Sequence, residues 1–205
     1  MRVALPDSTL GAARRSLRAE LSARRRAVGA AERTAAAERA ALNADRVLHL
    51  AAGQRIAVYA ALAGELDSAP LIALARSRGC RIFLPRIDRR RRSRGMRFVE
   101  LGGALRENRL GIGEPAGFIT IGARWLDLVF LPLVGFDRCG LRLGAGGGFY
   151  DRAFAFRQLR CVWHKPLLVG FGYAFQQVER LAAAPHDVFM DAVVTDEGFI
   201  RCTTG

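Results

Sequence analysis

The stretch Arg142-Leu-Gly-Ala-Gly-Gly-Gly-Phe-Tyr-Asp151 decides the interpretation of this chain, because it places four glycines within five positions between a guanidinium and a carboxylate. Each glycine costs about 0.5 to 1 kcal/mol of backbone entropy relative to alanine, so packing alone gives no reason for the cluster. A backbone without side chains can lie directly against a ligand. Arg142 and Asp151 are suited to a phosphate chain and a magnesium ion. The alternative is a glycine-rich turn that binds nothing.

The residues on either side of the loop predict where it lies. Leu126-Asp-Leu-Val-Phe-Leu-Pro-Leu-Val-Gly-Phe136 is almost unbroken in its apolar character, which is typical of a strand covered on both faces in a parallel sheet. Residues 149–159 have the pattern of a helix, so the glycines come just before a helix amino terminus, where free N–H groups attract anions. Since open α/β sheets bind ligands at the carboxyl ends of their strands, we expect the loop there.

The loop matches neither common nucleotide-binding fingerprint. A Walker loop ends in Gly-Lys-Ser/Thr, and Lys165 is the only lysine in the chain. A dinucleotide-binding turn needs Gly-x-Gly-x-x-Gly, and Phe149 stands where the third glycine belongs.

The rest of the chain alternates between helical and strand patterns. Residues 8–28 predict a helix with Ser8 as its cap, and an alanine-rich helix follows to about residue 52. We expect strands at residues 55–60, 80–85, 96–100, 166–171 and 191–195, and a helix at 68–78. The predicted fold class is α/β, a mostly parallel open sheet with helices on both faces. It forms a single domain over residues 1–205, with a helical N-terminal segment (1–52) and an α/β core (53–205).

Composition agrees with one globular domain of 205 residues, 51% apolar and 25% charged. No segment has the roughly 18 apolar residues of a membrane span, and the first residues lack the hydrophobic region of a secretory signal, so we expect a cytoplasmic protein without membrane contact. The four cysteines contain no Cys-x-x-Cys pair and the three histidines no ligand spacing. We therefore expect reduced thiols, and oxygen ligands for any metal.

The net charge of +13 raises the possibility of a nucleic-acid partner. The basic residues are nevertheless spread along the chain, and 31 of the 32 are Arg, which together with the many alanines indicates a compositional bias. The densest cluster, Arg89-Arg-Arg-Arg-Ser-Arg94, lies between two predicted strands and favours a solvated hairpin tip over a nucleic-acid patch. We expect only non-specific binding of nucleic acid.

The motifs resemble those of a known family. The segments Phe130-Leu-Pro-Leu-Val-Gly-Phe-Asp137 and Gly140-Leu-Arg-Leu-Gly-Ala-Gly-Gly-Gly-Phe-Tyr-Asp-Arg152 are similar to the signature of the 5-formyltetrahydrofolate cyclo-ligases, also called 5,10-methenyltetrahydrofolate synthetases. Further matches span about residues 14 to 196 in the family's order: Arg14-Arg-Ser-Leu-Arg18, Glu65, Leu84-Pro-Arg86, Gly111-Ile-Gly-Glu-Pro115, His186-Asp-Val-Phe-Met-Asp191 and Ala192-Val-Val-Thr195. Relatives more often carry Lys at the position of Arg14 and an aromatic residue at that of Leu110.

The resemblance implies a set of site residues. Arg14 and Arg18 lie four positions apart, so on a helix both project from one face and can clamp a triphosphate, although a solvated basic helix has the same spacing. Asp151 and Asp191 are the implied magnesium ligands, with Asp187 a nearby candidate, and Arg142 and Asp151 the implied catalytic pair. The implied nucleotide-binding residues are Arg14, Arg15, Ser16, Leu17, Arg18, Arg142, Leu143, Gly144, Ala145, Gly146, Gly147, Gly148, Phe149 and Tyr150. The implied folate-binding residues are Ala60, Glu65, Ala145, Gly146, Gly147, Gly148, Phe149 and Tyr150.

The implied reaction is the ATP- and Mg²⁺-dependent closure of 5-formyltetrahydrofolate to 5,10-methenyltetrahydrofolate, with release of ADP and phosphate. The implied partners are therefore a reduced folate and ATP, and we expect a monomer. Two alternatives stay open. One is another ATP-dependent enzyme on the same scaffold with an altered folate pocket, which would show at Ala60 and Leu110. The other is a basic, RNA-associated binding protein.

Overall fold

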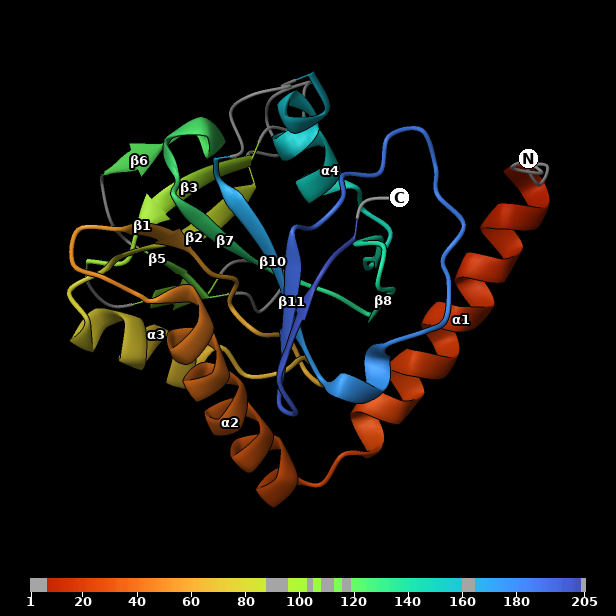
Figure 1. Ribbon diagram of the computed structural model, residues 1–205, viewed down its shortest axis with the longest axis horizontal. Helices are drawn as coiled ribbons and strands as arrows, with labels where there is room; N and C mark the ends of the chain where they lie inside the picture. The colour runs from red at the N-terminus through yellow and green to blue at the C-terminus, as the bar shows by residue number, and fades with distance from the viewer. Residues whose placement is uncertain are drawn as a thin grey trace.

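A mixed sheet forms the centre of the fold (Figure 1). The computed structural model describes residues 7–87, 96–102, 105–107, 113–115, 119–159 and 165–203. Within these residues the eight-stranded sheet has the order β12-β11-β10-β7-β1-β2-β3-β6. The five strands from β11 to β2 run parallel to one another. At the edges, β12 pairs antiparallel with β11, β3 pairs antiparallel with β2, and β6 pairs antiparallel with β3. Its strands are β1 (Arg55–Ala57), β2 (Arg81–Ile87), β3 (Met96–Glu100), β6 (Thr120–Ile121), β7 (Leu128–Pro132), β10 (Leu167–Gly172), β11 (Ala192–Thr195) and β12 (Phe199–Arg201).

Smaller elements surround this sheet. Two short antiparallel pairs join β4 (Leu105–Glu107) to β5 (Gly113–Pro115) and β8 (Gly135–Phe136) to β9 (Arg142–Leu143). The helices are α1 (Asp7–Ala27), α2 (Ala30–Leu48), α3 (Ala69–Ser77) and α4 (Phe149–Phe154), with 3₁₀ turns at Ala123–Trp125, Ala155–Leu159 and Ala174–Gln176. None of the described helices is long and apolar enough to cross a membrane.

Alternating side chains of the parallel strands build an apolar core on each face of the sheet. On one face, α2 and α3 cover residues such as Ile56 and Phe130, and five buried alanines of α2 allow the helix to approach closely. On the other face, Ala57 and Leu131 pack with Phe154 of α4. The sequence-based expectation of an α/β sheet with helices on both faces is therefore confirmed.

Helix α1 lies at one end of the sheet beside β8, apart from α2 and α3 (Figure 1). Its Leu21 enters a third apolar cluster with Val134, Leu141 and Leu143. The packing is close, because a Cβ on Gly135 would lie 2.7 Å from Leu21 Cδ1. The packing of Leu21 in this cluster sets the rotation of α1 about its axis, and thereby determines which of its side chains lie toward the glycine loop.

Several element boundaries differ from those predicted. Ser8 lies inside α1 and is not its cap, since the helix already includes Asp7. The second helix ends at Leu48, because His49 adopts a left-handed conformation with φ of 48°. The predicted helix over residues 149–159 is α4 followed by a 3₁₀ turn.

The long apolar run through residue 136 is also divided. It leaves the main sheet after Pro132. The side-chain N–H groups of Gln176 donate to the carbonyl oxygens of Leu133 and Val134, each at 2.9 Å. The chain then re-enters a separate strand pair at Gly135. This break opens space above the end of β7.

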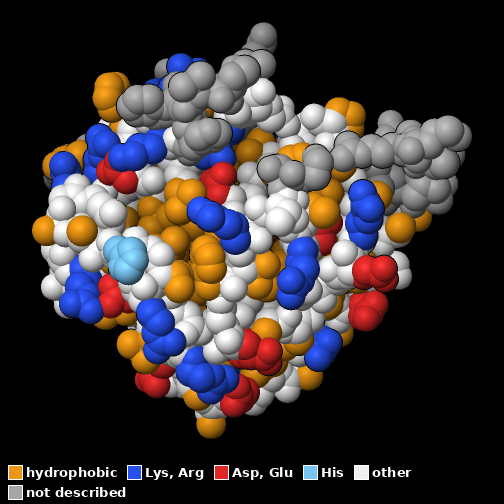
Figure 2. All heavy atoms as spheres, viewed as in Figure 1, with side chains coloured by type: hydrophobic (Ala, Val, Ile, Leu, Met, Phe, Trp, Pro, Cys, Tyr) orange, Lys and Arg blue, Asp and Glu red, His pale blue; other side chains and the backbone are white. Residues whose placement is uncertain are grey.

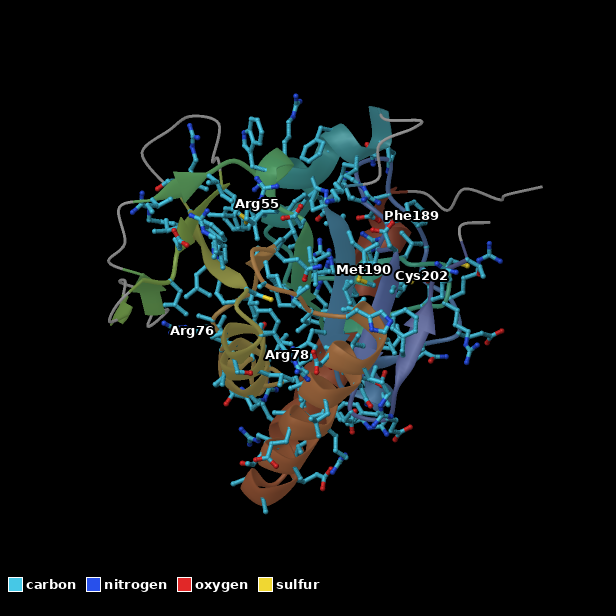
Figure 3. All side chains as sticks on the ribbon, turned by 60° about the vertical axis from the view of Figure 1, so that its left-hand side comes forward. Arg55, Arg76, Arg78, Phe189, Met190 and Cys202 are labelled. Atoms are coloured by element: carbon cyan, nitrogen blue, oxygen red, sulfur yellow. The ribbon has the colours of Figure 1, made fainter. Side chains whose placement is uncertain are left out.

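The C-terminal segment returns to the turn that precedes the glycine loop. Gly140 has φ of +88°, and a Cβ there would lie 2.5 Å from the carbonyl oxygen of Met190 and 3.1 Å from Cys202 Cβ. Figure 3 shows Met190 and Cys202 together at this junction. Only glycine fits this position, and the close approach brings the segment after residue 185 beside the loop.

Arginine side chains are dispersed over the face shown in Figure 2, between carboxylates and apolar groups. The Arg89 to Arg94 cluster, Leu110, Cys161 and His164 lie outside the described residues. The three described cysteines, Cys80, Cys139 and Cys202, are free thiols as expected.

Candidate active site

A cavity of about 240 Å³ lies at the carboxyl ends of β1, β2 and β7. This is the sheet edge at which the sequence predicts the glycine loop, and the loop forms one wall of the cavity. The other walls come from α1, the segment after β1, the adjoining ends of β2 and β3, and the turn at Asp187. Its lining is Arg14, Arg18, Tyr59, Ala60, Leu62, Glu65, Pro85, Ile87, Met96, Pro132, Leu133, Val134, Arg142, Gly144, Ala145, Gly146, Gly147, Gly148, Phe149, Tyr150, Asp151, His186 and Asp187.

The glycine loop owes its shape to backbone conformations that side chains disfavour. Gly146 and Gly148 have φ of +101° and +60°, and a Cβ on Gly147 would lie 2.6 Å from the Phe149 ring. The Nε of Arg18 donates to the carbonyl oxygen of Gly144 at 2.8 Å, which ties the loop to α1. Helix α4 begins directly after the loop but has only six residues. Side-chain cations therefore contribute more positive charge here than the helix dipole does.

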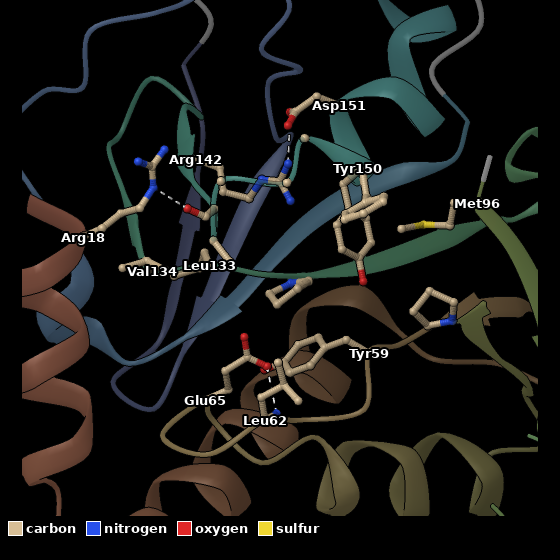
Figure 4. A pocket seen from close by; sticks show the side chains of 18 of the residues that line it. Arg18, Tyr59, Leu62, Glu65, Met96, Leu133, Val134, Arg142, Tyr150 and Asp151 are labelled. Carbon is tan, nitrogen blue, oxygen red and sulfur yellow. Dashed lines mark hydrogen bonds and ion pairs between the residues drawn. The ribbon is translucent and has the colours of Figure 1, made fainter. Parts of the chain in front are cut away.

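Arg142 and Asp151 meet at the top of the cavity in Figure 4. Nη2 of Arg142 donates to Oδ1 of Asp151 at 3.0 Å, and the backbone N–H of Val188 donates to the same oxygen at 3.3 Å. Arg142 is 8% exposed, and its guanidinium lies 5.3 Å from the centre of the Tyr150 ring. Its Nε is buried without a hydrogen-bond partner among the described residues. The guanidinium thus keeps capacity for a further anionic partner.

A second ion pair joins α1 to the C-terminal segment. The guanidinium of Arg14 forms two hydrogen bonds to the carboxylate of Asp187 and donates to the carbonyl oxygen of Ala182 at 2.8 Å. The backbone N–H of Ala184 donates to Asp187 Oδ2 at 2.7 Å. Two carboxylates, Asp151 and Asp187, therefore line the cavity, each held by an arginine.

The opposite side of the cavity is largely apolar and carries one carboxylate, Glu65 (Figure 4). The backbone N–H of Leu62 donates to Glu65 Oε2 at 3.0 Å. Burial raises the pKa of Glu65, and the Leu62 hydrogen bond and the charge of Arg25 act against this rise. Tyr59 and Tyr150 add aromatic surface, and burial raises the pKa of both phenols. This side suits a flat aromatic group that offers hydrogen-bond donors.

Most of the residues expected at the site line the cavity, and five do not. Arg15 and Ser16 are exposed on α1, Leu17 packs against the third apolar cluster, and Leu143 is fully buried. The fifth is Asp191, whose Oδ1 accepts from Arg157 at 2.6 Å and whose Oδ2 accepts from the backbone N–H of Leu168 at 2.7 Å. These bonds hold Asp191 at the start of β11.

Sequence reasoning had missed the apolar lining from β2 and β3. Pro85, Ile87 and Met96 carry no chemical signal in the sequence, although the position of Pro85 at a predicted strand end was a usable indication. The sequence indicates Asp187 only as a candidate near the implied ligand Asp191, and it gives no sign that His186 beside it lines the cavity.

The carboxylates of the site are oxygen donors of the kind that Mg²⁺ prefers. Within the described part of the chain, no group of three or more His, Cys, Asp or Glu side chains is placed to hold a metal ion. Two cavity carboxylates fit a magnesium ion that takes its remaining ligands from water and from substrate phosphates, which is the usual arrangement in phosphoryl-transfer sites.

Comparisons with known proteins give consistent results. A family model described as the 5-formyltetrahydrofolate cyclo-ligase family matches residues 11–196. The 5-formyltetrahydrofolate cyclo-ligase of Escherichia coli (strain K12) is 36% identical over 144 residues, which cover 68% of this chain and 76% of that protein. The mitochondrial 5-formyltetrahydrofolate cyclo-ligase of Arabidopsis thaliana is 37% identical over 110 residues, 51% of this chain and 36% of that longer protein.

The fold of the chain is also similar to that of a solved structure. The NMR structure of Aquifex aeolicus 5,10-methenyltetrahydrofolate synthetase superposes with a TM-score of 0.78 at 27% identity. The superposition covers 94% of each chain. The two chains therefore share one fold over nearly their whole length.

Proposed function

The chain belongs to the 5-formyltetrahydrofolate cyclo-ligase family, and from this premise we propose that its cavity closes 5-formyltetrahydrofolate to 5,10-methenyltetrahydrofolate at the expense of ATP. The observation that carries the proposal is the division of a single cavity. Arg142, Asp151 and the glycine loop form one side, and Glu65 with the aromatic surface forms the other. A triphosphate and a pterin bound on these two sides would meet between them.

We assign the phosphates of ATP to the side of the cavity formed by the glycine loop, because this side is positively charged and has N–H groups that can bind a further acceptor. Arg14, Arg18 and Arg142 line the cavity within reach of the loop, and Nε of Arg14 and of Arg142 is buried without a partner among the described residues. Charge-assisted bonds to phosphate oxygens would satisfy these groups. The glycines keep the wall free of side chains, so that phosphates can approach the backbone.

Asp151 and Asp187 are the proposed magnesium ligands, with Asp187 in place of the predicted Asp191. Asp187 lines the cavity, whereas Asp191 does not line it and is held by Arg157 and Leu168 at the start of β11. A bound Mg²⁺ would neutralise charge on the phosphates during transfer.

The folate side is assigned to Glu65, Tyr59, Ala60 and Tyr150. A carboxylate at Glu65 can accept paired hydrogen bonds from the amino and ring N–H groups of a pterin. Apolar side chains of β2, β3 and β7 then cover the rest of the ring system. Ala60 contributes only to the shape of the cavity wall, because its side chain is a methyl group.

The chemistry follows from this alignment. The formyl oxygen on N5 attacks the γ-phosphorus of ATP and ADP leaves, which gives an imino phosphate. N10 then attacks the activated carbon, the C–O bond breaks, and phosphate and the N10 proton depart. An amide oxygen is a poor leaving group and phosphate a good one, so the protein contributes positioning and charge neutralisation. Arg142 is placed to meet the developing phosphate charge.

A spectroscopic assay tests the proposal. We expect near-ultraviolet absorbance of the methenyl product when purified protein is mixed with 5-formyltetrahydrofolate, ATP and Mg²⁺, and no product when any one of the three is omitted. Hydrolysis of ATP without methenyl product would instead indicate a different ATP-dependent enzyme with an altered folate pocket. Sedimentation of the same sample checks the proposed monomer.

Two further expectations concern the location of the protein and its binding of nucleic acid. The cytoplasmic location stays a prediction, since one relative of the same family is mitochondrial. We expect any RNA binding to be non-specific and to lose most of its affinity between low and physiological salt. Filter binding at two salt concentrations distinguishes this from a tight, sequence-selective site.

A further inference from the structure

Helix α1 carries a stripe of three arginines, Arg14, Arg18 and Arg25, on the face that Leu21 anchors in the third apolar cluster. Positions 14, 18, 21 and 25 fall on one side of a helix with 3.6 residues per turn. Arg14 and Arg18 line the phosphate side of the cavity. The stripe therefore continues along α1 to Arg25, which has no role in the function proposed above.

Arg25 is buried in an unusual way for a cation. It is 8% exposed, and Nη1 donates to the carbonyl oxygen of Leu133 at 3.0 Å. Its Nε is buried with no hydrogen-bond partner in the described part of the chain, and none of the described carboxylates forms an ion pair with Arg25. Burial of a guanidinium costs free energy unless the charge interacts favourably with another group. The residues around Arg25 therefore indicate which group benefits from its charge.

The loop that carries Glu65 packs against α1 at this point. Gly64 has φ of +82°, and a Cβ there would lie 3.5 Å from Arg26 Cγ and 3.9 Å from the carbonyl carbon of Arg25. Leu133, whose carbonyl oxygen accepts from Arg25, lines the same cavity as Glu65. Helix α1 thus lies against the Glu65 loop at Arg25 and Arg26, while the guanidinium of Arg25 binds the cavity wall at the end of β7.

We propose that Arg25 is a positioning residue of the folate side: its charge keeps Glu65 available as a carboxylate acceptor, and its hydrogen bond fixes the cavity wall at Leu133. The inference rests on the proposed role of Glu65 in binding the pterin. Neutral Glu65 would present an O–H group to the pterin's own N–H donors and lose an acceptor.

The groups that interact electrostatically with Glu65 come from four elements. The N–H of Leu62 in its own loop and Arg25 on α1 lower its pKa, and the charge of Glu65 in turn raises the pKa of Tyr59 after β1 and of Tyr150 on α4. Burial raises the pKa of both tyrosines, so they stay neutral around neutral pH. Burial also raises the pKa of Glu65, and among the described residues Arg25 is the cation whose charge opposes this rise. Removing Arg25 therefore moves the pKa of Glu65 further upward.

The test compares Arg25→Met with Arg26→Met, its exposed neighbour on the same helix. KM for 5-formyltetrahydrofolate is measured with saturating ATP and Mg²⁺ at a series of pH values from mildly acidic to mildly alkaline. For Arg25→Met we expect KM to rise about tenfold at neutral pH, because loss of the nearby positive charge raises the pKa of Glu65 and leaves less of it as a carboxylate. The rise should shrink toward the alkaline end, where Glu65 ionises in the variant as well.

Three controls make the result decisive. Arg25→Lys keeps the charge and should restore most of the folate affinity. The kcat and the KM for ATP should change little in Arg25→Met. Thermal unfolding checks that each variant is folded. Calorimetric titration with 5-formyltetrahydrofolate alone gives the affinity without turnover. If folded Arg25→Met kept the wild-type pH profile, or if Arg26→Met had the same effect, the inference would be wrong. Failure of the wild-type protein to form product would instead overturn the proposed function.

Discussion

Arg14 and Asp187 form an ion pair inside the cavity although 173 positions separate them in the chain. Arg142 and Asp151 repeat the arrangement on the glycine loop, with Nη2 and Oδ1 at 3.0 Å. In each pair a proposed phosphate-binding cation holds a proposed magnesium-binding carboxylate. If the proposed function holds, the arginines would bind phosphate oxygens of ATP and the two aspartates would hold the Mg²⁺, so that these residues would exchange one another for substrate and metal. The pairs keep four charged groups compensated before substrate arrives.

The first prediction separates Asp187 from Asp191 as the second magnesium ligand. Asp187→Asn should raise the Mg²⁺ concentration for half-maximal rate by about tenfold or more, since each ligand of a hard cation contributes strongly. Asp191→Asn should leave this concentration unchanged but lower the free energy of unfolding by about 1 to 3 kcal/mol, because it weakens the bonds to Arg157 and Leu168. Mg²⁺ titrations and urea unfolding of both variants provide the measurement. The opposite pattern would indicate that Asp191, and not Asp187, is the second magnesium ligand.

The second prediction uses adjacent arginines on α1. Arg14 lines the cavity and Arg15 is exposed to solvent. Arg14→Met should raise the KM for MgATP by about tenfold or more, since a charge-assisted hydrogen bond is worth about 1.5 to 3 kcal/mol. Arg15→Met should change it less than twofold, on the order expected for a screened surface charge. Equal effects in steady-state kinetics would show that α1 acts only through its general positive charge.

The sequence predicts the position of the glycine-loop wall of the cavity, because the residues of this wall are close together in the chain. The glycine loop, Arg142 and Asp151 lie within ten positions, and the apolar run before them fixes the sheet edge at which they appear. The same local reasoning finds the parallel strands, whose apolar patterns show burial on both faces. Short-range pattern and the rule for α/β sheets suffice here.

Other features depend on tertiary packing, and the sequence alone cannot resolve them. Asp187 and Asp191 lie four positions apart in a segment without regular structure before β11, so spacing gives no indication of which one points into the cavity. Arg24, Arg25 and Arg26 are equivalent in the sequence. Only the rotation of α1, set by Leu21 in the third apolar cluster, buries Arg25 and leaves its two neighbours exposed.

The third prediction concerns stability at the sheet edge opposite the cavity. Burial acts to raise the pKa of Asp127, but hydrogen bonds from the side chain and backbone N–H of Arg55 and from Lys165 outweigh it and hold the pKa well below its ordinary value. A depressed carboxyl pKa stabilises the fold above the unfolded-state value near 4 and loses this effect as pH falls. Asp127→Asn should therefore destabilise the protein by about 1 to 3 kcal/mol at neutral pH.

The destabilisation by Asp127→Asn should decrease as the pH falls below about 4, because the wild-type carboxyl then loses its advantage. Urea unfolding at neutral and acidic pH measures both values. Because Asp127 does not line the cavity, KM for both substrates should stay at wild-type values in the folded variant. A pH-independent difference would mean that the amide loses packing or geometry and that charge is not the cause.

The last prediction separates shape from stability within the glycine loop. Gly144 has an ordinary φ, and a Cβ there would meet nothing within 4 Å, so Gly144→Ala should fold with wild-type stability while its methyl group occupies space at the phosphate wall. Gly146 has φ of +101°, so Gly146→Ala should lower the free energy of unfolding by about 1 to 3 kcal/mol through backbone strain. We expect Gly144→Ala to raise the KM for MgATP several-fold with an unchanged thermal midpoint, and Gly146→Ala to lower that midpoint. If Gly144→Ala bound MgATP as tightly as the wild type, the phosphates would lie elsewhere, because a wall in contact with the triphosphate leaves no room for an added methyl group.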